Sequence, residues 1–162
     1  MQTFIRLIAD GTLVPIVLIG VYALIAKVPK NHRYEVYCRV LMAGLTSLLI
    51  AKFMATLYHP EAERPFELLG VASGAAFLPN AGFPSDHAVF AAAILYAVWF
   101  ETRDKLLSSI LLVLLIVVGV GRVLALVHTP LDIFGGVVAA TVGAIWYLTK
   151  VPEKAHAKKI KS

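Results

Sequence analysis

The chain has 162 residues, enough for one domain, and 59% of them are hydrophobic whereas only 15% are charged. A mean hydropathy of +0.81 exceeds what the core of a soluble protein of this size requires, so the composition predicts a membrane protein. The formal net charge of +5 does not indicate nucleic-acid binding, because the basic residues are scattered among apolar runs and form no stripe.

The apolar runs predict the order of the elements. Residues 1–10 are expected to form a short helix on the membrane surface, and the run Gly11–Ala26 that follows is interpreted as an uncleaved anchor. The later runs are Val40–Ala51 with a continuation to Tyr58, Pro84–Phe100, Leu106–Val127 and Ile133–Thr149. A bilayer core needs roughly 20 helical residues, and helices satisfy their own backbone hydrogen bonds in lipid. The sequence therefore predicts an all-α polytopic bundle of about five transmembrane helices, forming one membrane-embedded domain over residues 1–162.

Two features remain outside this pattern. The stretch Phe66–Phe83 is apolar but is interrupted by three glycines, a proline and an asparagine, so it is expected to be a loop or a partial re-entry and not a sixth span. The single cysteine, Cys38, excludes an internal disulfide and a cysteine cage for a metal, and we assign it no function.

The basic residues predict the orientation of the bundle. Most of them fall in three regions that five spans would place on one side, and the positive-inside rule makes that side the cytoplasm. These regions hold eleven of the 15 lysines and arginines: Lys27, Lys30, Arg33, Arg39, Arg103, Lys105, Lys150, Lys154, Lys158, Lys159 and Lys161. Residues 151–162 are therefore expected to be a basic cytoplasmic tail. Of the remaining four, Lys52, Arg64 and Arg122 lie near the outer ends of spans, where a cation is costly unless it has a partner or a ligand.

Polar residues from three separate stretches are expected to meet at this outer face. His87 begins the third span, and His128 and Asp132 lie in the connection between the fourth and fifth spans. Guanidinium groups match phosphate oxygens two at a time, and a histidine can attack phosphorus or protonate a departing oxygen. The residue types of this face therefore predict a site for a phosphate group. Its expected members are Lys52, Arg64, Ser85, Asp86 through its backbone, His87, Arg122, His128 and Asp132.

The local sequence suggests how the site is organised. Pro84 suits the first turn of a helix, so the backbone N–H groups of Ser85 to His87 are expected to point at a bound anion. Asp132 is expected to hold the far nitrogen of His128 and to stabilise the imidazolium. Because three cations can neutralise the phosphate, neither a metal nor another cofactor is expected.

Several of these residues also have a purely structural interpretation. Thr129 to Asp132 forms a potential capping box, which would in addition place the carboxylate rigidly beside His128. Ser85 can be a neighbour of a helix cap, and Lys52 can extend its side chain to the membrane interface. For His128 the functional interpretation is favoured, because a cation and an acid accompany it at fixed spacings.

The spacing of these residues resembles a known signature. The three motifs of the type 2 phosphatidic acid phosphatase family are similar to Arg64-Pro65, Pro84-Ser85-Asp86-His87 and Arg122-x5-His128-x3-Asp132. The resemblance implies a membrane phosphatase in which His128 forms a phosphohistidine, His87 protonates the departing oxygen and Asp132 orients His128. It also implies which residues hold the phosphate: Lys52, Arg64, Ser85 and Arg122.

The chain departs from the family pattern at three positions. Eleven residues separate Lys52 from Arg64, where the family usually has six, so Lys52 is expected to sit deeper. Gly121 replaces the usual serine, and Asp86 replaces the usual glycine. The Pro-Ser-Asp-His form resembles the branch that removes phosphate from undecaprenyl diphosphate, which is the first expected substrate. Phosphatidylglycerol phosphate, phosphatidic acid and lipid A phosphate remain as alternatives.

A transporter or channel for an anionic lipid or an ion is the alternative from another class. It predicts ionisable residues through the full membrane depth, whereas the inner halves of the first, third, fourth and fifth expected spans carry none. The resemblance implies an integral protein of the bacterial inner membrane that acts on a lipid-linked phosphate and has no nucleic-acid partner. Its site is expected to face the periplasm or the cell exterior, with the C-terminus in the cytoplasm.

Overall fold

The computed structural model describes residues 2–58, 64–80 and 82–149, and every regular element in those ranges is helical. The all-α prediction is therefore confirmed for this part of the chain, whereas the predicted basic tail at 151–162 lies outside it. The helices are α1 (Gln2–Arg6), α2 (Leu13–Ala26), α3 (Arg33–Leu57), α4 (Pro65–Leu68), α5 (Asp86–Thr102), α6 (Lys105–Leu124) and α7 (Pro130–Gly143). Three short segments have other helical geometries: η1 (Leu7–Gly11) is a π-helix, and η2 (Lys30–His32) and η3 (Ala144–Thr149) are 3-10 helices.

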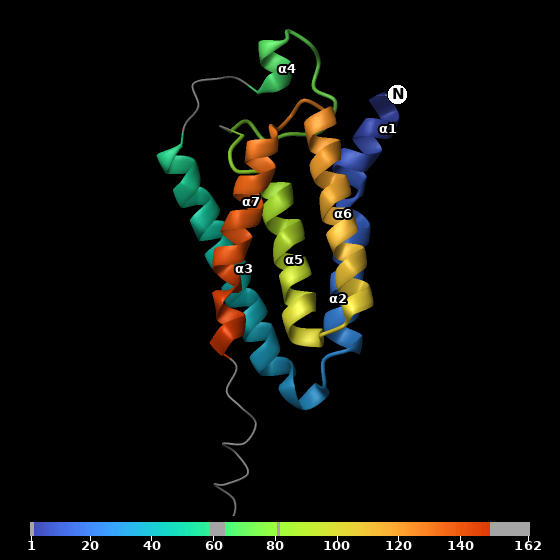
Figure 1. Cartoon of the computed structure of the whole chain (residues 1–162), viewed down its shortest axis with the longest axis vertical. Coiled ribbons are helices and arrows are strands. Elements are labelled where there is room, and N and C mark those ends of the chain that lie inside the picture. Colours follow the sequence, from blue (N-terminus) through green and yellow to red (C-terminus); the bar gives the residue numbers. More distant parts are fainter. Residues whose placement is uncertain (1, 59–63, 81, 150–162) are drawn as a thin grey trace, which may run out of the picture.

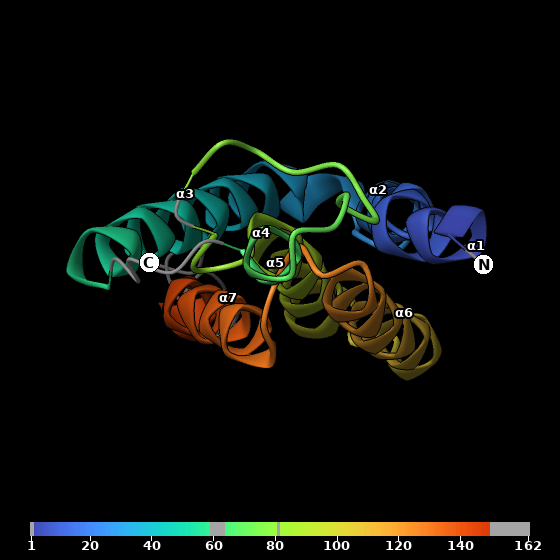
Figure 2. The same ribbon diagram turned by 90° about the horizontal axis from the view of Figure 1, so that it is seen from above.

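Helix α5 occupies the centre of the bundle. Seen from above, α2 and α3 lie on one side of it and α6 and α7 on the other (Figure 2), and α5 contacts all four. Small side chains on α5 let its neighbours approach closely. At Gly136 of α7, for example, an added Cβ would lie 2.7 Å from the Cβ of Ala88. The buried alanines of α5 are Ala88, Ala91, Ala92 and Ala97.

Four helical segments of the described chain are long and apolar enough to cross a membrane: Gln2–Ala26, Lys30–Leu57, Lys105–Leu124 and Pro130–Thr149. The chain is thus an integral membrane protein, but the predicted number of about five spans is not confirmed. The remaining predicted span corresponds to α5, whose 17 residues are at the lower end of the roughly 17–25 that cross a bilayer. In Figure 1 the N-terminal end of α5 lies deeper in the bundle than the neighbouring ends of α6 and α7. That recessed end forms the floor of the site described below.

The N-terminal segment differs from the expected surface helix. α1 and η1 run into α2 with no loop between them, so residues 2–10 belong to the outer part of the first long helical segment and do not form a separate helix. The physical reason is burial: Ala9 is inaccessible to solvent and packs in a cluster with Phe66, Ala75, Ala125 and Val127. Contacts of α1 and η1 with α6 hold this segment against the bundle.

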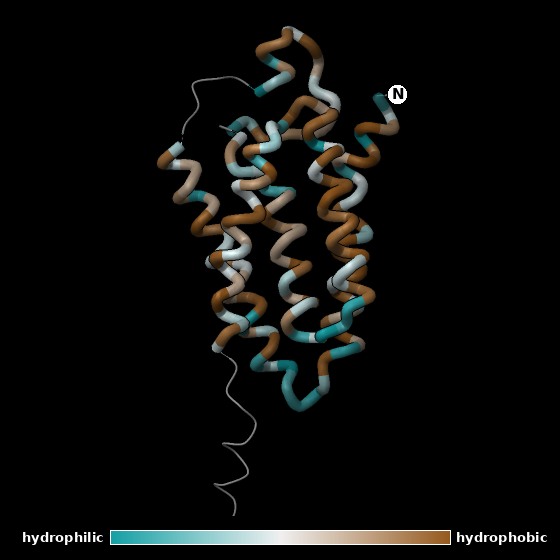
Figure 3. The backbone as a smooth tube through the Cα atoms, in the orientation of Figure 1, coloured by the Kyte–Doolittle hydropathy of each residue, from teal (hydrophilic) through white to brown (hydrophobic). Residues whose placement is uncertain are grey.

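The polar residues collect at the two ends of the bundle, with a hydrophobic band between them (Figure 3). At one end, α4 and the irregular chain that follows it cross over the helices (Figure 1), and the described residues of this stretch contain no helix long enough for a sixth span, as predicted. At the other end, ion pairs join neighbouring helix ends. Lys27 lies 3.2 Å from Asp104, and Arg39 makes two hydrogen bonds to Glu101, of 2.8 and 3.0 Å.

Candidate active site

A cavity of about 220 Å³ opens at the end of the bundle where α4 lies. Two arginines and two histidines from four separate stretches line it: Arg64, His87, Arg122 and His128. Asp86 also lines the cavity, as do Ala76, Phe77, Leu78 and Asn80 of the crossing loop. The structure therefore brings together most of the residues that the sequence predicted to meet. The loop supplies walls that no motif indicated.

Arg64 is fixed by backbone oxygens from two directions. It is buried at the start of α4, where its backbone N–H donates to Oε2 of Glu67 at 2.6 Å. Its Nη1 donates to the carbonyl oxygen of Val127 at 2.6 Å, and its Nη2 donates to the carbonyl oxygen of Leu78 at 2.9 Å and to Oδ1 of Asn80 at 2.7 Å. Burial lowers the pKa of Arg64 and the charge of Glu67 opposes this shift, but a guanidinium stays protonated in proteins. Arg64 thus presents a positive charge held between the crossing loop and the residue before His128.

Arg122 is the largest fully buried side chain of the described residues, 2% exposed in the last turn of α6. Its Nη1 donates to Oδ1 of Asp10 at 2.8 Å and to the carbonyl oxygen of Ala76 at 2.7 Å. Its Nε is buried and has no hydrogen-bond partner within the described chain. A buried donor without a partner is costly, so this nitrogen is available to a ligand oxygen.

His128 and Asp132 form the pair that the spacing predicted. Nδ1 of His128 lies 3.4 Å from Oδ2 of Asp132, and both side chains are buried. Burial lowers the pKa of His128 below 6.5, and the neighbouring carboxylate of Asp132 opposes this shift. The imidazole is therefore neutral near pH 7. With Nδ1 facing Asp132, the lone pair of Nε2 is free to act as a nucleophile.

The capping box at the start of α7 is also present. Oδ2 of Asp132 accepts a hydrogen bond of 2.7 Å from the backbone N–H of Thr129, and Oγ1 of Thr129 accepts one of 3.3 Å from the backbone N–H of Asp132. The structural interpretation of Asp132 is thus confirmed, and the cap fixes the carboxylate beside the imidazole, which is the position that the functional interpretation requires.

The start of α5 differs by two residues from the prediction. Ser85 is the N-cap and Asp86 the first helical residue, so Pro84 precedes the helix. The backbone N–H of Ser85 donates to the carbonyl oxygen of Asp132 at 3.0 Å and is not free for an anion. The first intrahelical bond runs from Val89 to Ser85, which leaves the N–H groups of Asp86, His87 and Ala88 for a ligand. The hydroxyl of Ser85 is buried without a hydrogen-bond partner in the described chain and does not line the cavity.

Lys52 is another predicted residue that does not line the cavity. Its side chain extends from α3, is 63% exposed, and has its Nζ 3.5 Å from Oδ1 of Asp86. The acid at position 86 therefore has a cationic neighbour at the rim.

Sequence reasoning missed Asp10 and Asn80, which hold the two arginines. Asp10 carried a usable signal, since an acid within a helical apolar segment is costly unless it has a partner. Asn80 carried none, because its bond to Arg64 joins residues brought together only by the folded loop. Among the described residues, no three histidine, cysteine, aspartate or glutamate side chains are grouped to hold a metal ion.

A helical membrane bundle with two buried arginines and two histidines around one cavity has the groups that match the oxygens of a phosphate-type anion. The family comparison agrees with this chemistry. The model of the PAP2 superfamily matches residues 35–155, and the chain belongs to that superfamily. The resemblance predicted from the motifs is therefore confirmed.

Two curated relatives are similar to the chain. "Putative undecaprenyl-diphosphatase YbjG" of Escherichia coli (strain K12) is 32% identical over 117 residues, which cover 68% of this chain and 54% of that protein. "Undecaprenyl-diphosphatase BcrC" of Bacillus subtilis (strain 168) is 32% identical over 105 residues, which cover 64% of this chain and 53% of that protein. The chain thus spans about half the length of the curated relatives it matches. No solved structure matches it.

Proposed function

We propose that this protein is a lipid phosphatase that hydrolyses undecaprenyl diphosphate to undecaprenyl phosphate through a phosphohistidine at His128. The convergence of Arg64, Arg122, His87 and His128 on one cavity carries this proposal. Membership of the PAP2 superfamily and the names of the two relatives support it.

In the first step, Nε2 of His128 attacks the terminal phosphorus. The nitrogen–phosphorus bond forms as the bond to the bridging oxygen breaks, and the electron pair of that bond stays on the oxygen. His87 gives its proton to this leaving oxygen, and a bound phosphate dianion favours the protonated form of His87 before transfer. Asp132 stabilises the positive charge that develops on the imidazole of His128. Arg64, Arg122 and the N–H groups at the start of α5 hold the phosphate oxygens.

In the second step, water attacks the phosphorus of the phosphohistidine. An oxygen–phosphorus bond forms, the nitrogen–phosphorus bond breaks, and its electron pair returns to Nε2 of His128. His87, now neutral, takes the proton from the water. Inorganic phosphate leaves, and both histidines regain their starting protonation states. No step of this cycle uses a metal, so phosphate release is expected to persist in the presence of a chelator.

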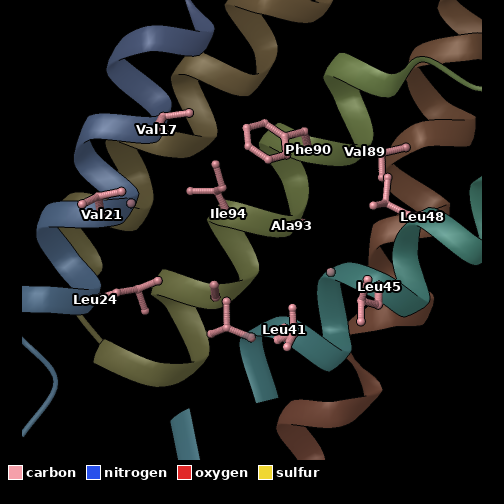
Figure 4. Close-up of a pocket in the computed structure, with 14 residues that line it drawn as sticks. Val17, Val21, Leu24, Leu41, Leu45, Leu48, Val89, Phe90, Ala93 and Ile94 are labelled. Carbon is pink, nitrogen blue, oxygen red and sulfur yellow. The ribbon is translucent and has the colours of Figure 1, made fainter. Parts of the chain in front are cut away.

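An apolar groove beside the site supports a lipid substrate. It has a volume of about 380 Å³ and is lined by residues of α2, α3 and α5. Val17, Val21 and Leu24 of α2 face Leu41, Leu45 and Leu48 of α3 across the groove, and Phe90 and Ile94 of α5 lie between them (Figure 4). Phe90 is one helical turn from His87, so a hydrocarbon chain in the groove would place its phosphate at the recessed end of α5.

Undecaprenyl diphosphate is the first choice of substrate because of Asp86. This acid stands where most of the family has glycine, and both relatives with undecaprenyl-diphosphatase names match the chain at 32% identity. Phosphatidylglycerol phosphate, phosphatidic acid and lipid A phosphate are the alternatives within the same reaction class.

The distribution of basic residues favours one orientation of the bundle in the membrane. We propose a bacterial inner-membrane location with the site facing the periplasm or the cell exterior and the C-terminus in the cytoplasm. The end opposite the site carries the larger share of basic residues, as the positive-inside rule requires. In the described chain these are Lys27, Lys30, Arg33, Arg39, Arg103 and Lys105. A transporter would need charged groups along the whole path, whereas the residues of α2 and of the described part of α7 beyond Asp132 are uncharged.

Purified protein in detergent tests the activity. Undecaprenyl diphosphate is supplied with a chelator and the released phosphate is measured, with phosphatidylglycerol phosphate assayed in parallel. A His128→Ala variant is expected to be inactive, whereas His32→Ala at the opposite end of the bundle is expected to retain full activity. Full activity of the His128→Ala variant would refute the mechanism. Faster turnover of phosphatidylglycerol phosphate would reassign the substrate.

A further inference from the structure

Asp10 lies in the π-helical turn that joins α1 to α2. η1 spans Leu7–Gly11, and contacts with α6 place it beside the last turn of that helix. Single π turns inside α-helical segments recur at functional sites, because the wider turn redirects a side chain. Asp10 lies outside residues 35–155, the part of the chain that the family model matches.

The carboxylate of Asp10 closes a ring with Arg122 and Ala76. Its Oδ1 accepts a hydrogen bond of 2.8 Å from Nη1 of Arg122, and its Oδ2 accepts one of 3.0 Å from the backbone N–H of Ala76. The carbonyl oxygen of Ala76 accepts a second bond from the same Nη1, at 2.7 Å. Three segments are thereby joined at one guanidinium nitrogen: the N-terminal helix, the end of α6 and the crossing loop that walls the cavity.

Gly121 makes this arrangement possible. A Cβ at this position would lie 2.9 Å from the backbone nitrogen of Ala9 and 2.7 Å from the side chain of Ile8. Only glycine therefore lets the N-terminal segment approach α6 closely enough for Asp10 to reach Arg122. Close packing of the two helices thus explains why the residue before Arg122 is a glycine.

We infer that Asp10 is the positioning residue of Arg122: it holds Nη1 and so directs the remaining guanidinium nitrogens toward the substrate phosphate. This inference rests on the proposed function. Nη1 already has two acceptors, whereas the buried Nε has none in the described chain. A planar guanidinium fixed at one nitrogen has its other donors fixed as well, which is the preorganisation that phosphate binding requires. Asp10 itself does not line the cavity, but it contacts Arg122 and Ala76, which do.

The test is a double-mutant cycle between Asp10 and Arg122. In the wild-type background, Asp10→Ala is expected to lower kcat/KM about tenfold to a hundredfold, because a charged hydrogen bond to a buried group is lost. In an Arg122→Ala background, the same change is expected to lower kcat/KM less than about twofold, since Asp10 then has nothing to position. Asp10→Asn keeps the size of the side chain and replaces Asp10→Ala if that variant does not fold.

The matched control is Asp104→Asn. Asp104 also pairs with a cation and has a similarly exposed side chain, but it lies at the opposite end of the bundle, so kcat/KM is expected to stay at the wild-type value. Equal losses from Asp10→Ala in both backgrounds, or no loss in either, would overturn the inference.

Binding of inorganic phosphate separates this inference from the proposed function. Phosphate is expected to raise the Tm of the detergent-solubilised wild type, and to raise the Tm of Asp10→Ala less. One outcome would refute the proposed function and leave the assignment of Asp10 intact. In that outcome, phosphate raises the Tm of the wild type, Asp10→Ala weakens this rise, and the wild type releases no phosphate from any lipid. A wild-type Tm that phosphate does not change, or a gain that Asp10→Ala leaves intact, would overturn the assignment of Asp10.

Discussion

Replacement of Asp132 by asparagine removes the negative charge of the side chain but keeps an oxygen that can cap α7. Oδ2 of Asp132 serves both Nδ1 of His128, at 3.4 Å, and the backbone N–H of Thr129, at 2.7 Å. An asparagine oxygen can still accept the bond from Thr129, but it has no charge to offer an imidazolium. The variant is therefore expected to fold normally and to lose catalysis.

The magnitude follows from the distance. Two unit charges 3.4 Å apart interact by about 5 kcal/mol at an effective dielectric constant of about 20. Part of this remains in Asp132→Asn because the amide oxygen keeps a dipole, so about 3–4 kcal/mol of transition-state stabilisation is expected to be lost. That corresponds to a fall in kcat of about two to three orders of magnitude. Stability should change by less than about 1 kcal/mol, since the cap is retained.

Phosphate release in detergent under saturating substrate gives kcat, and thermal unfolding gives the stability. Thr129→Ala is the matched control: it removes the hydroxyl half of the capping box but leaves the backbone N–H that holds the carboxylate. This control is expected to lose about 1 kcal/mol of stability and to keep most of its kcat. A wild-type kcat for Asp132→Asn, or an equal fall in both variants, would show that Asp132 acts only as a cap.

Four further outcomes are expected. Because burial lowers the pKa of His128, the acid limb of kcat/KM, where protonation of His128 removes the nucleophile, should be centred below pH 6.5; an acid limb centred above 6.5 would contradict this. Arg64→Lys cannot keep all three guanidinium hydrogen bonds, so thermal unfolding should show a loss of about 2–4 kcal/mol, together with lower kcat/KM. Gly121→Ala should lower kcat/KM by pushing Ala9 away, and an unchanged rate would contradict the close approach. Lys52→Met should change kcat/KM less than about fivefold, because the exposed ion pair of Lys52 with Asp86 contributes about 1 kcal/mol or less. A much larger loss in the same assay would indicate that Lys52 contacts the phosphate.

The sequence was sufficient for the class of fold and for the centre of the site. Uncharged apolar runs of bilayer length can only be helices in lipid, so hydropathy alone predicted the bundle. The fixed spacing of Arg122, His128 and Asp132 spans one helix end and the next helix start, which makes their proximity a local property. His128 and Asp132 therefore lie together in the structure. The residue before His128, Val127, provides the carbonyl oxygen that accepts a hydrogen bond from Arg64.

Residues whose placement depends on distant contacts were harder to predict. The start of α5 is recessed under the crossing loop (Figure 1), and hydropathy does not show how deep in the bundle a helix begins. The N-terminal ten residues were expected on the membrane surface, yet burial of Ala9 against a distant cluster aligns them with α2. Lys52 carried the charge of a phosphate ligand, but the position of α3 leaves it at the rim beside Asp86.

The sequence by itself thus determined the membrane environment, the helical class and the proximity of His128 and Asp132, since each of these depends on composition or on short spacing. Only the tertiary structure decided which groups hold the two arginines. Asp10 and Arg122 are 112 positions apart, and their bond of 2.8 Å exists because Gly121 lets two helices meet. Contacts of this kind are set by the packing of complete helices, which no short stretch of sequence encodes.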